Sequence, residues 1–320
     1  MKKLIINILL LTGVMLTSCS DDGHVKIVSL NTFGNKVCMN DRVKVFVSAE
    51  TDGDEAPTYE WGCSDGAMTN PQGLFENVWQ APKTPGEYEI WVTVKCGDSK
   101  ETRRAKMTVL DELFYSDFET PYYNEGYSNS SMTLAQDNKT GSLKLTSSKD
   151  KGVFQRNWDD ETIAPPYSMQ MKYNPQTFKS GNTIDFRIAF SSSDEGTKDL
   201  RNINLSIEPL TGNVSIYSQF FNKETGNVES LSAVPTVIDD FKFTKKWKYV
   251  SVSLDASNKF IVYLEGVKIM ESDFLKTFFP QSSYPIKGSG IAMSNKAVTL
   301  VDDMSVIING EICNATERIR

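Results

Sequence analysis

The chain has 320 residues, of which 39% are hydrophobic and 23% are charged, a composition typical of a globular protein that can bury sizeable cores. Its net charge of −7 at pH 7 argues against nucleic acid and against an anionic membrane surface as partners. The one histidine, His24, precedes the first predicted strand, which excludes a Ser-His-Asp triad and a histidine-rich zinc site from the folded body.

The N-terminal stretch has the features of a secretory signal peptide. Two lysines precede a mostly apolar run over residues 4–15, which is shorter than the about 20 apolar residues of a membrane-spanning helix. The sequence LTSC (16–19) at the end of this run resembles the lipobox of bacterial lipoproteins, in which the cysteine becomes the new N-terminus and carries lipid. The resemblance implies a signal peptide over 1–18 and lipidation of Cys19. An ordinary cleaved signal with a chance cysteine is the alternative.

Residues 19–24 are expected to form a tether between the lipid and the first domain. Within it, SDD (20–22) resembles the acidic signal that directs lipoproteins of some Gram-negative bacteria to the outer face of the cell. This resemblance implies an outer membrane lipoprotein that faces the exterior, whereas physical chemistry alone says only that two aspartates are solvated. Because no later segment is apolar enough to cross a membrane, contact with the membrane is expected through the lipid anchor only.

Residues 25–111 are predicted to form a small antiparallel β-sandwich. Short runs that alternate apolar and polar residues, such as VKVFVSAE (43–50), are separated at intervals of about 10 residues by clusters of glycine, proline and aspartate. The pieces YEW (59–61), WQAP (79–82) and PGEYEIWVTV (85–94) resemble the PKD-like branch of immunoglobulin-fold domains. Domains of that kind act as spacers, so the resemblance implies a spacer between the membrane and the next domain.

Four cysteines follow Cys19, namely Cys38, Cys63, Cys96 and Cys313. In an oxidising compartment they allow three pairings, and the spacing alone does not choose among them. No CxxC motif occurs, so zinc and thioredoxin-like redox sites have no support in the sequence. The resemblance to an immunoglobulin fold implies that Cys38 and Cys63 lie at the same end of the sandwich and Cys96 at the other, so a Cys38–Cys63 disulfide is expected.

Residues 112–310 are predicted to form a second, larger β-sandwich, and 311–320 a C-terminal tail. Helical periodicity is nearly absent, and DFLKTFF (273–279) is the only short helical candidate. Runs with strand periodicity cover 142–148, 167–173, 183–193, 203–221, 246–270 and 290–308.

The most informative stretch lies near the C-terminal end of this domain. YVSVSL (249–254) and FIVYL (260–264) alternate with a period of two around the turn DASN (255–258), and EG (265–266) makes a second turn. This pattern, together with the ending VDDMSVI (301–307), resembles the laminin-G/concanavalin-A-like jelly roll over the whole segment. The resemblance implies the fold more than the function, because similar domains bind glycans, cleave them or bind proteins.

No catalytic motif is found in the sequence. Glucanases on this fold carry Glu-x-Asp-x-x-Glu on one strand, which places two carboxylates about 5 Å apart as acid and nucleophile. Glu271 and Asp273 lack the third acid of that pattern, and the acidic run DDE (159–161) is expected to be a solvated loop. We therefore assign no catalytic residue and expect a protein that is not an enzyme.

A structural calcium ion is the metal site that the resemblance to jelly-roll carbohydrate-binding modules implies. In several such modules a Phe-Glu near the start and an Asp near the end share the ion, and Asp117, Glu119, Asp302 and Asp303 resemble that arrangement. Carboxylate oxygens that converge where the first and last strands meet would suit Ca²⁺. Unrelated surface acids are the alternative.

Aromatic side chains in two predicted loops form the candidate ligand-binding site. Sugar-binding surfaces on such folds stack aromatic rings on pyranose rings, and exposed aromatic loops need burial or a ligand. The predicted ligand-binding residues are Tyr122, Tyr123, Tyr127, Arg156 and Trp158. Packing of these rings onto the sandwich is the alternative.

In the first domain, Trp79 and Trp91 are expected to be structural, with a sugar platform as the alternative.

Together with the predicted localisation at the outer membrane, these features favour a cell-surface lipoprotein that binds a polysaccharide or host glycan without cleaving it. Such a protein would serve as an accessory of glycan capture and uptake, with other outer-membrane uptake proteins as further partners. A protein-binding adhesin or structural surface protein is the first alternative, and a glycan-cleaving enzyme is the second.

Overall fold

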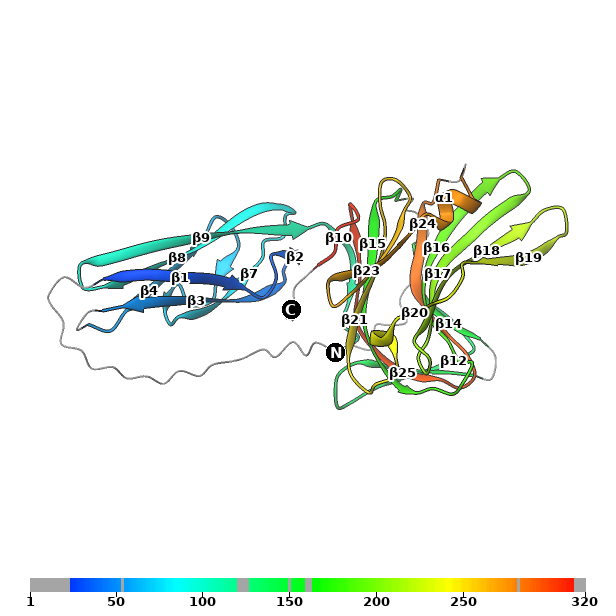
Figure 1. Cartoon of the computed structure of the whole chain (residues 1–320), viewed down its shortest axis with the longest axis horizontal. Helices are drawn as coiled ribbons and strands as arrows, with labels where there is room; N and C mark the ends of the chain where they lie inside the picture. Colours follow the sequence, from blue (N-terminus) through cyan, green and yellow to red (C-terminus); the bar gives the residue numbers. More distant parts are fainter. Residues whose placement is uncertain are drawn as a thin grey trace. The chain divides into compact units, whose positions relative to one another are not determined.

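In a computed structural model the described residues are 24–52, 55–119, 127–148, 151–158, 163–280 and 283–313, with the backbone alone described over 192–195. Strands dominate these residues (Figure 1), which confirms the predicted all-β fold class of two successive sandwiches. No helix among them is long and apolar enough to span a membrane. Cys19, the signal peptide, most of the tether, and Tyr122 and Tyr123 lie outside the described residues.

The described residues of the first sandwich form nine strands in two sheets. Their orders are β1-β3-β7-β5 and β2-β9-β8-β4-β6, and β2 runs parallel to β9. The strands are β1 (Val25–Thr32), β2 (Lys36–Cys38), β3 (Arg42–Thr51), β4 (Thr58–Cys63), β5 (Ala67–Met68), β6 (Gln72–Gly73), β7 (Glu76–Gln80), β8 (Gly86–Cys96) and β9 (Ser99–Leu110). Their inward residues, among them Trp61 and Ile90, are almost fully buried, as the alternation of apolar residues predicts.

The second sandwich is larger, and its described residues include one short α-helix and one turn of 3₁₀-helix. Its elements are β10 (Glu112–Ser116), β11 (Tyr127–Ser130), β12 (Met132–Gln136), β13 (Leu143–Ser147), β14 (Gly152–Asn157), β15 (Tyr167–Thr177), β16 (Ile184–Glu195), β17 (Lys198–Glu208), β18 (Asn213–Asn222), β19 (Asn227–Ser232), β20 (Thr236–Val237), η2 (Asp239–Phe241), β21 (Lys248–Leu254), β22 (Phe260–Leu264), β23 (Val267–Ser272), α1 (Phe274–Phe278), β24 (Ile286–Met293) and β25 (Val298–Ile308).

Two eight-stranded sheets form this second sandwich. The β15 sheet has the order β12-β13-β25-β15-β21-β22-β23, with β10 also paired to β25. The β16 sheet has the order β11-β14-β24-β16-β17-β18-β19, with β20 also paired to β18. Strands β16 to β19 follow one another in the chain as an antiparallel meander (Figure 1), so the side chains of consecutive runs become neighbours on one sheet.

A single apolar core joins the inward faces of these two sheets. On β16, Ile184, Phe186 and Ile188 are fully buried, and the ring of Phe186 lies edge-on to that of Tyr173 on β15, with centroids 5.1 Å apart. Large side chains from both sheets therefore interlock, and this hydrophobic burial is the main stabilising contribution to the domain.

Turn chemistry explains where the predicted runs differ from the observed strands. The run 203–221 is two strands because Gly212 adopts a φ of +75°, which glycine tolerates best, and closes the turn between β17 and β18. The run 290–308 is likewise two strands, with Asn295 and Lys296 at positive φ between them. The predicted turn at 255–258 and the helical candidate at 273–279 are both present.

By its internal contacts the chain separates into two compact units. Within the described residues the first unit contains 24–32, 44–79 and 89–106, and the second contains 33–43, 80–88 and 107–313. The predicted boundary after residue 111 separates β1 to β9, which form the first sandwich, from β10 and the later strands, which form the second. The division by internal contacts differs from this boundary, because it groups residues 33–43, which include β2, with the second sandwich.

Replacement of Phe186 by alanine should lower the free energy of unfolding by about 3–5 kcal/mol, because the cavity left between two packed sheets cannot collapse fully. Urea denaturation followed by tryptophan fluorescence measures this loss. Val234, which is 88% exposed, provides the control, since Val234→Ala should change stability by less than about 0.5 kcal/mol. Equal effects of the two substitutions would contradict the described core.

Candidate functional site

The outward surface of the β16 sheet carries a continuous set of polar side chains. Side chains alternate between the two faces of a strand, so on β16 Asp185 and Arg187 lie opposite the core residues. We call this set the polar face, and its members are Lys151, Gln155, Asn157, Asp185, Arg187, Asn202, Asn204, Ser206, Tyr217 and Gln219. Asp185, Asn202 and Asn204 are almost fully buried, although they face away from the core.

A glycine allows residues two strands apart to touch at the centre of the polar face. In the sheet register Gly290 on β24 pairs with Gln155 on β14 and with Arg187 on β16. A Cβ at Gly290 would lie well inside contact distance of a backbone carbonyl oxygen of β14. Because Gly290 has no side chain, Gln155 extends across β24 and its Oε1 accepts a hydrogen bond of 2.9 Å from Nε of Arg187.

Arg187 links the side chains of the polar face by hydrogen bonds to two other strands. Besides its bond to Gln155, its Nη1 donates to Oε1 of Gln219 on β18 over 3.2 Å. Burial lowers the pKa of Arg187, while the nearby Tyr217 and Asp185 act in the opposite direction, and a guanidinium stays charged at neutral pH. Among the described residues Nη2 takes part in no hydrogen bond, so two of the N–H groups of this fixed cation are available to a ligand.

Amide side chains continue the network from Arg187 along β17 and β18. Nδ2 of Asn202 donates to the same Oε1 of Gln219 over 3.1 Å, and Nδ2 of Asn204 donates to Oδ1 of Asn202. The Oδ1 atom of Asn204 is buried and has no hydrogen-bond partner within the described part of the chain. A buried acceptor without a partner is costly, so Asn204 is a strained point of the network.

A buried carboxylate closes the network at one end. Asp185 forms an ion pair with Lys151 and accepts hydrogen bonds from Ser206 Oγ (2.6 Å) and Tyr217 Oη (2.8 Å). Nζ of Lys151 also lies 4.7 Å from the centre of the Tyr217 ring. Burial, followed by the charge of Asp185, raises the pKa of Tyr217 well above its usual value, so its hydroxyl acts as a neutral donor.

The polar face combines a single carboxylate with cationic, amide and phenol groups. It presents guanidinium, ammonium, amide and phenol groups that hold one another in position, and Asp185 is the only carboxylate in the set. Hydrolysis of a glycoside by the common mechanism requires two carboxyl groups, and the polar face does not supply them.

The structure brings three of the predicted ligand-binding residues together, but as a packing contact. Tyr127 stacks on Phe154 with ring centroids 4.7 Å apart, and Phe114 lies edge-on to both Tyr127 and Trp158. The Arg156 guanidinium lies 5.2 Å from the centre of the Phe114 ring. Tyr127 and Trp158 pack against the core, and burial raises the pKa of Tyr127 to about 12. These contacts agree with the packing alternative.

Trp79 and Trp91 of the first domain also have structural environments. Trp79 is fully buried, and its Nε1 donates to the carbonyl oxygen of Asp65 over 3.1 Å. Trp91 lies so close over Gly62 that any side chain there would collide with the indole, and the Arg104 guanidinium lies 5.0 Å from its ring centre.

Two of the acids predicted to hold calcium are neighbours on β25. Asp303 is buried, pairs with Lys172 and accepts a hydrogen bond of 2.6 Å from the Tyr115 hydroxyl. Burial, followed by the charge of Asp303 and then of the more distant Asp117, raises the pKa of Asp302 to about 7.

The other two predicted calcium ligands lie before β11. The side chain of Glu119 lies against Gly141, and Oδ1 of Asp117 accepts a hydrogen bond of 3.1 Å from the backbone N–H of Glu119. Among the described residues, the only three acid or cysteine side chains with ligand atoms within 4.8 Å of one another are elsewhere. The four acids are thus not gathered into a preformed cage, and calcium binding stays a prediction.

The expected Cys38–Cys63 disulfide is not formed, and none of the four described cysteines is joined in a disulfide. Cys63 lies on β4 and is partly exposed. Cys38 ends the short strand β2, which pairs with the end of β9, and it lies instead beside Asp41 and Cys313. Cys38 lies there because β2 pairs in parallel with the end of β9. The alternation of apolar and polar residues in the sequence does not indicate such a pairing.

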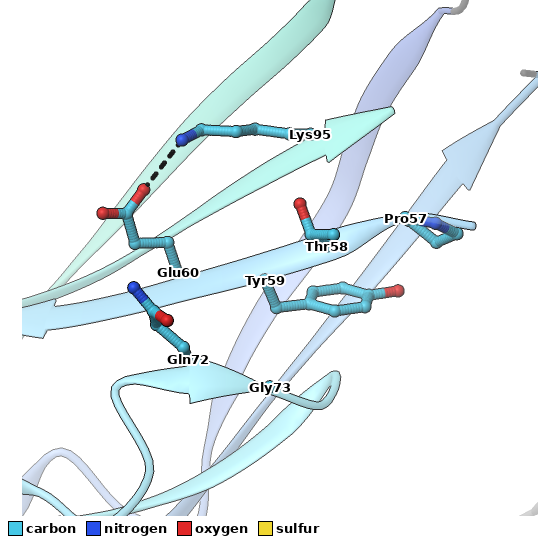
Figure 2. Close-up of a pocket in the computed structure, with 7 residues that line it drawn as sticks. All are labelled: Pro57, Thr58, Tyr59, Glu60, Gln72, Gly73 and Lys95. Atoms are coloured by element: carbon cyan, nitrogen blue, oxygen red, sulfur yellow. Dashed lines mark hydrogen bonds and ion pairs between the residues drawn. The ribbon is translucent and has the colours of Figure 1, made fainter. Parts of the chain in front are cut away.

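An open hollow of about 450 Å³ lies on the first sandwich. Figure 2 shows Glu60 of β4 pointing toward Lys95 of β8, while the ring of Tyr59 points toward the end near Pro57. The Glu60–Lys95 pair (3.0 Å) is about half exposed, and Gln72 of β6 lines the other side. The hollow is polar and mostly open to solvent, so it offers fewer fixed groups to a ligand than the polar face.

The polar face was not predicted from the sequence, although the sequence contains a pattern that could have indicated it. The strands β17 and β24 read N-x-N-x-S (202–206) and G-x-G-x-A (288–292), so polar residues and small residues each repeat with the period of a strand. A row of small residues beside rows of amides indicates a surface where side chains of the flanking strands can meet.

No protein-family model and no curated protein matches this chain. Several solved structures resemble this chain, with low sequence identity and low TM-scores. The botulinum neurotoxin serotype D binding domain is 14% identical, with a TM-score of 0.41 over 63% of this chain and 49% of its own. A Bacillus subtilis protein of unknown function with a galectin-like fold is 11% identical, with a TM-score of 0.41 over 62% of this chain and 96% of its own.

The carbohydrate recognition domain of Emp47p is 13% identical, with a TM-score of 0.40 over 62% of this chain and 94% of its own. The chain thus matches about half the length of the neurotoxin domain and nearly all of the other two. At such TM-scores the similarity does not assign a ligand to this protein.

Replacement of Gly290 by alanine should lower the free energy of unfolding by about 1–3 kcal/mol, because the added methyl group forces β14 away from β24. Denaturant unfolding measures the change. Ser232, at the exposed end of the same cross-strand row, supplies the control, and Ser232→Ala should stay within about 0.5 kcal/mol of the parent. An unchanged stability of Gly290→Ala would show that the strands are not held this close.

Proposed function

We propose that this protein is a cell-surface lipoprotein that binds a glycan through the polar face without cleaving it. The observation that carries the proposal is the placement of Arg187, which Gln155 and Gln219 hold on the sheet surface with Nη2 directed to neither of them. A cation fixed by neutral amides keeps its capacity for a ligand, whereas a cation paired with a carboxylate does not.

The chemistry of sugars fits this surface. Each sugar hydroxyl both donates and accepts hydrogen bonds, so a hydroxyl oxygen can accept from the N–H groups of Arg187 that the network does not use. Because the side chains already bind one another, little rotamer freedom is lost when a ligand arrives, which favours affinity. The small residues of β24 let the side chains of Gln155 and Asn157 lie over that strand, where they form part of the surface that a ligand would meet.

The predicted N-terminal features supply the rest of the proposal. Lipidation at Cys19 and the acidic residues after it support an anchor in the outer membrane with the protein facing the exterior. The first sandwich would then act as a spacer, and the protein would serve as an accessory of glycan capture beside other outer-membrane uptake proteins.

The test is affinity gel electrophoresis of the purified full chain in detergent against neutral and acidic polysaccharides from plant, host and microbial sources. At least one should retard the parent protein, and Arg187→Ala should weaken that retardation by about 10-fold to 100-fold, as expected for a hydrogen bond from a charged group. Thermal unfolding of the variant shows whether it remains folded.

Two variants serve as matched controls for the location of the site. Tyr59→Ala removes the ring from the hollow of the first sandwich, and Trp158→Ala alters the packed aromatic cluster. Both should bind as the parent does. Binding lost only in Trp158→Ala would move the site to the cluster. No retardation by any polysaccharide would favour the protein-binding adhesin, and new reducing ends or unsaturated products would favour the enzyme.

A further inference from the structure

A buried group of two cysteines and one aspartate lies apart from the polar face, within the second compact unit. Its members are Cys38, Asp41 and Cys313, each at most 1% exposed. The two sulfur atoms and one carboxylate oxygen all lie within 4.8 Å of one another. Residues near the two ends of the described chain therefore meet in a site that solvent does not reach.

Hydrogen bonds hold Cys313 in place on the β15 sheet. Its backbone N–H donates to Oε1 of Gln170 over 3.1 Å, and its carbonyl oxygen accepts from Nε2 of the same side chain over 3.1 Å. Just before it, the carbonyl oxygens of Gly310 and Glu311 accept hydrogen bonds from the hydroxyls of Ser253 and Ser168. The C-terminal segment thus covers polar residues of β15 and β21 that would otherwise face solvent.

Hydrogen bonds also hold Cys38 in place, at the end of β2. It pairs with Leu110 at the end of β9, and its backbone N–H donates to Oδ2 of Asp41 over 2.8 Å. The N–H of Asp41 returns a hydrogen bond to the Cys38 carbonyl oxygen over 3.2 Å, across Asn40 at a φ of +64°. This closed turn presents the Cys38 side chain to Cys313.

We propose that Cys38 and Cys313 form a disulfide as the protein folds in an oxidising compartment, before the site is closed to solvent. A disulfide has an S–S length of about 2.05 Å, so the two side chains have a gap of under about 3 Å to close. In the reaction a thiolate of one cysteine attacks a disulfide of an exchange partner, such as oxidised glutathione, and releases one thiolate. The second cysteine then displaces the other half, so the protein loses two protons and two electrons and the oxidant becomes two thiols.

The remaining cysteines are placed differently. Cys96 is buried, and its thiol donates to the carbonyl oxygen of Glu55 over 3.2 Å. Cys63 is partly exposed on β4, and burial raises the pKa of its thiol, which lowers its reactivity. A bond between Cys38 and Cys313 would close most of the chain into one loop, and long loops gain the most from such a cross-link.

The test uses the full chain, refolded with a mixture of reduced and oxidised glutathione. The chain is then unfolded in denaturant, alkylated, digested without reduction and examined by mass spectrometry. A linked peptide pair that contains Cys38 and Cys313 is expected, and reduction should lower the unfolding temperature of the parent by about 5–15 °C. Cys313→Ser should lack both the linked pair and the shift on reduction, whereas the control Cys96→Ser should keep both.

Three results would overturn the proposal. One is complete alkylation of Cys38 and Cys313 in the oxidised parent, and another is a linked pair that joins Cys38 to Cys63. The third is about one equivalent of zinc per chain in elemental analysis of the parent with none in Cys313→Ser, since that outcome would make the group a metal site instead of a cross-link. Because each readout is independent of glycan binding, failure here leaves the proposed function untouched.

Discussion

The guanidinium of Arg187 is held on the surface of a β-sheet by two neutral amides, and the organisation of the polar face depends on that arrangement. Burial of a cation is costly unless it is hydrogen-bonded, so Gln155 and Gln219 must be positioned from strands on either side. This requirement fixes the register of β14, β16 and β18. It also requires a strand between β14 and β16 that carries no side chain at the crossing point, which Gly290 provides.

The sandwich supplies the rigid support for this surface. The same strands that carry Arg187 and Gln219 outward place Phe186 and Phe220 inward, in a core that is almost fully buried. A change in register by one residue would exchange the two faces, so the core and the polar face specify each other. The apolar core thus fixes the position of the polar face, and the proposed ligand would meet side chains that are already ordered.

The sequence predicts the local structure well and the assembly of the site poorly. Alternation identifies strands such as Tyr249–Leu254, and the aspartate at 255 marks its turn because its carboxylate accepts from the backbone N–H groups of Ser257 and Lys259. The polar face escapes prediction because Gln155, Arg187 and Gln219 belong to separate runs that only sheet pairing brings together.

Aromatic content alone does not distinguish a binding site from a packing contact in this sequence. An aromatic ring that packs a loop onto the sandwich and one that stacks on a sugar give the same sequence signal, and Tyr127 proves to stack on Phe154. Cysteine pairing is similarly non-local, since Cys38 meets Cys313 through the parallel pairing of a three-residue strand. Both cases show that contacts between distant segments decide what a residue does.

The most direct test of the central claim is a crystal structure of the protein soaked with a short oligosaccharide of a polysaccharide that it retains. The account predicts sugar density over the polar face, between Gln155 and Tyr217, with a sugar oxygen within hydrogen-bond distance of Nη2 of Arg187. Density over the packed aromatic cluster around Phe114, or in the hollow beside Tyr59, with the polar face unchanged, would contradict it.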